Sequence, residues 1–180
     1  MSEENSFLFA EYAKPKTHVG KNRKARILLI SFYVLFAVCY TVLFSAITLP
    51  QVIALLPLFV WMLVYFTWGT VNYECCVRVA SGKVRLLKLQ GKKEKEFFSF
   101  EVKELLYALP YNEMGKKKVA EEKISKTVDL RANELGDGYA AVLRSDGEAI
   151  LVRFECSMAV ANAMHYYNKN VVVDKDFLSV

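Results

Sequence analysis

The stretch ILLISFYVLFAVCYTVLFSAITLPQVIALLPLFVWMLVYFTWGTVNY, residues 27–73, decides the fold of this chain. It holds no Asp, Glu, Lys, Arg or His, and Arg26 and Glu74 bound it on its two sides. A helix that crosses a hydrocarbon core of roughly 30 Å needs about 20 apolar residues. The stretch is about twice that length, so it predicts two membrane spans.

A turn is expected in the middle of this stretch, at residues 48–51. Pro50 lacks a backbone N–H and its ring clashes with the preceding helical turn, so a helix arriving from Ile27 should end near Leu49. We therefore predict a transmembrane helical hairpin at residues 27–71, with spans at 27–49 and 52–71. Two buried helices of a soluble protein are the alternative, but such helices show a polar face to water, and this stretch carries no charge.

Positive charge gathers just before the first span. Basic residues close to a span favour the cytoplasmic side of the membrane, so both termini of this multi-pass protein of the cell membrane are expected in the cytoplasm. Basic side chains near the surface attract anionic lipid headgroups, and aromatic rings are enriched at the interface. The predicted membrane interface consists of Lys21, Arg23, Lys24, Arg26, Trp68 and Tyr73.

The sequence is divided into three parts: a cytoplasmic N-terminal basic segment at residues 1–26, the hairpin at 27–71, and a cytoplasmic domain at 72–180. Residues 1–13 are open to two interpretations, an amphipathic segment on the headgroups or a frayed terminus. The domain carries 18 basic and 16 acidic side chains. This near balance argues against a nucleic-acid binder, which needs a surface of one sign.

After Tyr73 the hydrophobic pattern changes from helical to alternating, which is typical of β-strands. The expected strands are residues 73–79, 84–90, 96–101, 105–111, 124–131, 139–144 and 148–155. Ser157 should cap a closing helix whose apolar face contains Val160, Met164 and Tyr167. About seven strands followed by one helix is the order of a mainly-β PH-like barrel with a C-terminal capping helix.

Several motifs also resemble those of a bacterial family of two-transmembrane-helix proteins with a cytoplasmic PH-like domain. They are Tyr73-Glu74-Cys75-Cys76-Val77, Ser81-Gly82-Lys83-Val84, Phe97-Phe98-Ser99-Phe100, Ala108-Leu109-Pro110-Tyr111 and Val152-Arg153-Phe154-Glu155. The sequence departs from that family at Cys156-Ser157, where the family has a proline-containing helix start. The resemblance implies no catalytic or binding residues.

The residues themselves give no pattern for an enzyme. His18 and His165 are isolated in the sequence, whereas nucleophile and base sets need partners. No spacing of the four cysteines suggests zinc, and we expect no cofactor and no metal. Lys92, Lys93 and Lys95 are interpreted as solvated turn residues, because glutamates alternate with them.

We therefore expect a non-enzymatic membrane protein that presents a PH-like binding module at the cytoplasmic membrane surface. The alternative is an accessory or regulatory subunit of a larger membrane complex. The expected partners are the lipid bilayer with its anionic headgroups and a membrane protein, and not nucleic acid.

Overall fold

The computed structural model describes residues 9–47, 50–145 and 147–178. Its contacts divide the chain into two compact units. The helical unit comprises His18–Tyr73, and the β unit comprises the described residues up to Thr17 together with those from Glu74 onward. The second unit is thus built from two pieces of sequence that the first one separates.

The helical unit contains α1 (Gly20–Ala46), α2 (Pro50–Ile53), α3 (Leu56–Thr67) and the 3-10 helix η1 (Trp68–Thr70). The segments Gly20–Ala46 and Gln51–Thr70 are long and apolar enough to be candidate membrane spans. Only 6% and 0% of their most apolar windows are buried. Large apolar side chains therefore face outward, which is unlike the core helices of a soluble protein.

The helix boundaries differ from the expected spans. α1 begins at Gly20, so the basic segment forms its first turns instead of preceding it. Pro50 opens α2, and α3 restarts with Pro57 near its N-terminus. Proline is tolerated in the first turn of a helix because its missing N–H has no partner there. The expected turn residues 48 and 49 lie outside the described residues.

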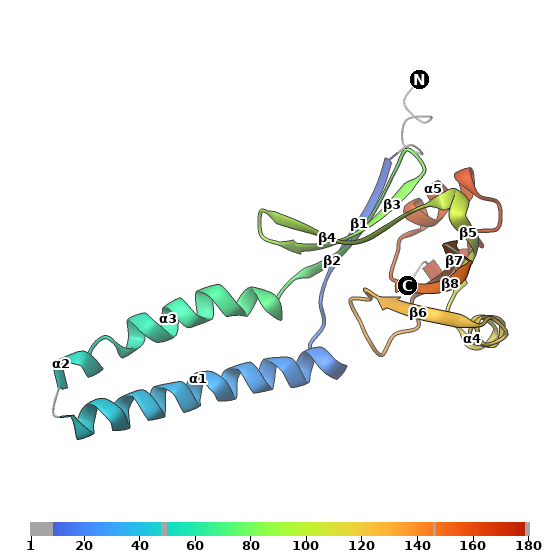
Figure 1. Ribbon diagram of the computed structural model, residues 1–180. Helices are drawn as coiled ribbons and strands as arrows, with labels where there is room; N and C mark the ends of the chain where they lie inside the picture. Colours follow the sequence, from blue (N-terminus) through green and yellow to red (C-terminus); the bar gives the residue numbers. More distant parts are fainter. Residues whose placement is uncertain (1–8, 48–49, 146, 179–180) are drawn as a thin grey trace. The chain divides into compact units, whose positions relative to one another are not determined.

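The β unit consists of two four-stranded sheets (Figure 1). The first sheet has the order β1-β2-β3-β4, formed by Phe9–Pro15, Glu74–Ala80, Lys83–Gln90 and Lys93–Glu101. The second has the order β5-β7-β8-β6, formed by Leu105–Pro110, Tyr139–Ser145, Glu148–Phe154 and Ile124–Asp129. The helices of this unit are η2 (Val102–Glu104), α4 (Glu113–Ala120), α5 (Met158–Tyr167) and α6 (Lys175–Leu178). All pairs are antiparallel except the parallel pair of β6 with β8.

Strand β1 is the main departure from the sequence-based prediction. Its residues were expected to be an amphipathic or frayed segment, but Phe9–Pro15 pairs with β2 along its full length. The pairing runs from Phe9 opposite Ala80 to Pro15 opposite Glu74. The boundary expected at residue 26 is therefore wrong for the strand-forming part of the N-terminal segment, which belongs to the β unit.

The core lies between the sheets and α5, which contacts β1, β2 and η2. Alternation along residues 148–155 predicts that Ile150, Val152 and Phe154 are buried. Val152 and Phe154 are fully buried, as are Val160 and Met164 on the apolar face of the closing helix, whereas Tyr167 of that face is half-buried. Ile150 is only half-buried, so its predicted burial is wrong.

A second apolar cluster buries Leu151, the residue of β8 that follows Ile150. Leu151 points to the other face of the second sheet, where it packs with Tyr107, Leu109 and Val119 of α4. Both faces of the sheet are therefore covered, and alternation alone could not identify the inner one. α4 begins at Glu113, where the Asn112 side chain caps it by accepting a hydrogen bond from the Gly115 N–H at 3.0 Å.

Candidate functional site

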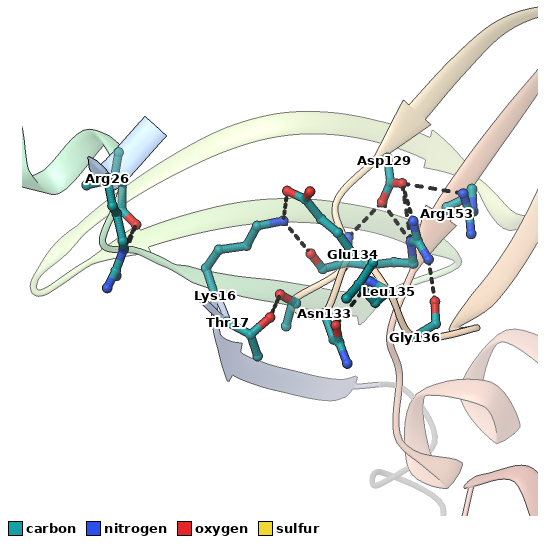
Figure 2. A network of polar contacts seen from close by, with 12 residues as sticks. Lys16, Thr17, Arg26, Asp129, Asn133, Glu134, Leu135, Gly136 and Arg153 are labelled. Carbon is teal, nitrogen blue, oxygen red and sulfur yellow. Dashed lines mark hydrogen bonds and ion pairs between the residues drawn. The ribbon is translucent and has the colours of Figure 1, made fainter. Parts of the chain in front are cut away.

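The residues after β1 are held by the loop that follows β6. Lys16 is 92% buried, and its Nζ donates to the carbonyl of Arg131 at 2.9 Å and forms an ion pair with Glu134 at 3.0 Å (Figure 2). Thr17 donates from its backbone N–H and from its hydroxyl to the carbonyl of Ala132, at 3.0 and 2.9 Å. These contacts fix the chain to the β unit immediately before it enters the helical unit.

The same loop is stiffened by a buried arginine. Arg131 donates to both carboxylate oxygens of Asp129 and to the carbonyl of Gly136 (Figure 2). Arg153 approaches the same carboxylate at 3.7 Å. Burial opposes ionisation of Asp129, but the bonds from Arg131 outweigh it and hold the pKa of this carboxyl below its usual value. The loop is thus a preformed platform for the end of β1.

A cavity of about 230 Å³ opens beside this platform. Its lining includes Lys14, Asn133, Tyr139, Glu155 and Cys156. Lys14 and Glu155 form an ion pair of 2.9 Å, and the Asn133 N–H donates to the other oxygen of Glu155 at 2.6 Å. The charged groups of the cavity are paired with one another, so it offers a ligand no unbalanced charge.

The outer face of the first sheet carries an ion-pair ladder. Arg78 on β2 forms ion pairs of 3.0 Å with Glu11 on β1 and with Glu94 on β4. Arg85 on β3 lies 4.0 Å from Glu96 on β4. The bonds from Arg78 lower the pKa of Glu11. Glu94 and Glu96 of β4 are therefore paired with arginines on this outer face.

The predicted membrane-interface residues all lie in the helical unit, and the structure assigns them different roles. Arg26 donates to the carbonyl of Val71 and, at 2.9 Å, to the side-chain oxygen of Asn72. Its guanidinium also lies 5.6 Å from the centre of the Trp68 ring. Arg26 therefore ties the start of α1 to the end of η1, a structural role that the sequence pattern did not reveal.

The other predicted interface residues differ in their exposure to solvent. Lys21, Arg23 and Lys24 are exposed on the first turns of α1. Tyr73 is half-buried. These residues remain a predicted lipid interface, whereas Arg26 is engaged within the protein.

The thiols of the β unit are buried. Cys75, Cys76 and Cys156 are at most 9% exposed and form no disulfide. Burial raises the pKa of Cys75 to about 11 and of Cys76 to about 12, so both are protonated near neutral pH. Within the described residues, no group of three His, Cys, Asp or Glu side chains has the geometry of a metal site.

Comparison with known proteins identifies the fold family. A family model described as Bacterial PH-like domain (DUF6106) matches residues 8–174. The match runs from the first strand through the closing helix. No curated protein and no solved structure matched the chain.

Proposed function

Because this chain belongs to the bacterial PH-like domain family (DUF6106), we propose that it is a non-enzymatic membrane protein whose helical unit anchors a PH-like binding module at the cytoplasmic face of the cell membrane. The module carries the recognition function, and the two candidate spans keep it at the bilayer surface. The proposal rests mainly on where the helical unit is inserted in the chain.

The helical unit interrupts a pair of neighbouring strands. Pro15 at the end of β1 lies opposite Glu74 at the start of β2. Both ends of the inserted segment therefore leave from one place in one folded domain. Since a folded domain occupies one side of a membrane, the segment must cross the bilayer an even number of times. Two candidate spans satisfy this requirement, and a single span does not.

The basic residues at the start of the first candidate span indicate on which side of the membrane the β unit lies. The exposed Lys21, Arg23 and Lys24 lie at the start of the first candidate span, and basic residues in this position favour the cytoplasm. The uncharged connection between α1 and α2 would then reach the opposite side. A binding function is favoured over catalysis, because both histidines make structural bonds. His18 Nε2 accepts from Arg26 at 2.7 Å, and His165 Nδ1 contacts the carbonyl of Val171 at 2.6 Å.

Cysteine labelling in intact cells tests this topology. In a Cys39→Ser background, the substitutions Gln51→Cys and Lys103→Cys place one thiol between the spans and one on the β unit. A membrane-impermeant maleimide should label the first in intact cells and the second only after lysis. Both parent side chains are exposed, so failure to react will reflect the membrane and not burial. Labelling at position 103 from outside would overturn the proposal.

A further inference from the structure

An apolar groove of about 200 Å³ opens between α4 and the segment that follows α5. Buried Leu109 and Pro110 of β5 line it, together with Met114 of α4 and Val172, which are 78% and 48% exposed. Exposed apolar side chains are ordinary when they are scattered singly, but these two share one groove with buried apolar residues. Methionine is flexible and polarizable, so it adapts to the shape of a partner.

Both walls of the groove are fixed by the fold. Gly115 lets α4 lie close to the end of β5, because a Cβ at this position would clash with the carbonyl oxygen of Pro110. On the opposite wall, the Val172 N–H donates to the carbonyl of Ala108 at 2.8 Å. The Tyr139 hydroxyl donates to the Val172 carbonyl at 2.7 Å. The groove is therefore preformed, and a ligand need not order its backbone.

Positive charge lies beside these apolar residues. Lys118 lines the groove, and its Nζ lies 4.5 Å from the centre of the Tyr107 ring. The ring attracts the ammonium group but carries no net charge, so it positions the lysine without neutralising it. Lys117 is exposed next to it. Glu121 and Glu122 follow the helix, and within the described residues neither is in an ion pair with these lysines.

The acidic side chains nearest the groove are bound within the protein. Glu113, in the first turn of α4, forms an ion pair of 3.4 Å with Lys116. Asp174 lines the groove, but its carboxylate accepts from two backbone N–H groups at the start of α6, at 3.1 and 3.2 Å. The charge that the groove offers to a ligand is therefore positive.

We propose that this groove binds an acidic segment of a partner protein, with one apolar side chain of the segment between Met114 and Val172 and a carboxylate against Lys118. Pockets for small molecules usually measure about 300–1,000 Å³, so this smaller groove suits a single side chain carried by a longer chain. Acidic residues of the segment complement the lysines of α4. This inference rests on the binding role proposed above and gives that role a partner and a site.

A library of random short peptides displayed on phage tests the groove. The bait is the full chain in phosphatidylcholine nanodiscs, and empty discs first remove peptides that bind lipid. Selected peptides should combine acidic with apolar residues. Met114→Ser and Lys118→Glu should each weaken binding of a selected peptide by about tenfold, as expected for residues central to an interface. The matched control Lys103→Glu reverses an exposed charge on η2 and should leave the affinity unchanged.

Hydrogen exchange on the same discs locates the bound peptide. Binding should slow exchange in α4 and at residues 170–174 and leave β3 and β4 unchanged. Selected peptides without acidic residues, or binding that Met114→Ser and Lys118→Glu leave intact, would overturn the proposal.

The remaining outcomes also decide. Enrichment of no peptide over empty discs would overturn the site, and slowing elsewhere on the β unit would keep the binding role but remove this groove. Cross-linking of two chains through Met114→Cys, in a Cys39→Ser background without peptide, would assign the groove to a second copy of the chain. The anchoring proposal fails separately, if the chain does not insert into discs.

Discussion

Replacing Lys16 by methionine tests whether the N-terminal segment is a structural part of the β unit. The Lys16 side chain is 7% exposed, and its Nζ meets the carbonyl of Arg131 at 2.9 Å and the carboxylate of Glu134 at 3.0 Å. Methionine keeps the apolar stem of the side chain but removes the ammonium group. The substitution therefore deletes the polar contacts without leaving a large cavity.

The expected loss of stability follows from these contacts. A hydrogen bond from a charged donor to a buried carbonyl contributes about 1.5–3 kcal/mol. The Glu134 side chain is 21% exposed, so its ion pair adds less than about 1 kcal/mol. We expect Lys16→Met to lower the free energy of unfolding by about 2–3 kcal/mol. A double-mutant cycle with Glu134→Gln should give a coupling of about 0.5–1 kcal/mol for the ion pair alone.

The buried thiols provide the assay. In a Cys39→Ser background, Cys75, Cys76 and Cys156 react with a maleimide only when the β unit opens. Their labelling during a urea titration therefore reports its unfolding while the chain stays in detergent. For a slope of about 1–3 kcal/mol per molar urea, the midpoint should fall by roughly 0.7–3 M. A midpoint equal to that of the exposed-lysine control Lys103→Met would refute docking of the N-terminal segment on the β unit.

Three further predictions use the same measurements. Phe154→Ala removes a ring that is 0% exposed and should cost about 3–5 kcal/mol in the thiol assay, whereas an unchanged midpoint would contradict the core assignment. Arg26→Gln should speed hydrogen exchange at residues 68–72 while the chain still inserts into membranes, because it removes the bonds at the end of η1; unchanged exchange would argue against that structural role. The raised pKa values of Cys75 and Cys76 favour the protonated folded state, so stability should be complete below about pH 9 and fall as the pH rises toward 11–12. Urea midpoints measured between these limits should decline less when both thiols are replaced by alanine.

Local sequence patterns determined much of this protein. The absence of charge over residues 27–73 predicted two apolar helices, and alternation located β3, β8 and the strands between them. These features depend on periodicities within one element, which a single segment of sequence records in full. The serine cap of α5 was equally local, since the Ser157 side chain bonds the N–H of Val160 only three residues away.

Which side chains each sheet buries on its two faces could be determined only from the tertiary structure. Ile150 and Leu151 are neighbours with similar side chains, and only the packing of α4 on the second sheet makes Leu151 the more buried of the two. On β4, the glutamates and Lys95 alternate in the sequence and looked mutually neutralised. Pairing with β3 places Glu94 and Lys95 on opposite faces of the sheet, so Glu94 forms its ion pair with Arg78 of β2.

Strand β1 depended on tertiary structure most of all. Phe9–Pro15 is short and only weakly alternating, so nothing within it predicts a strand. It becomes one because β2 offers an open edge, although the whole helical unit lies between the two strands in the chain. Pairing between strands so far apart in the sequence depends on which strand edges come together in the folded domain. Local hydrophobic periodicity therefore cannot predict it. The sequence therefore predicted two apolar helices, and the fold alone showed that they form an insertion within the β unit.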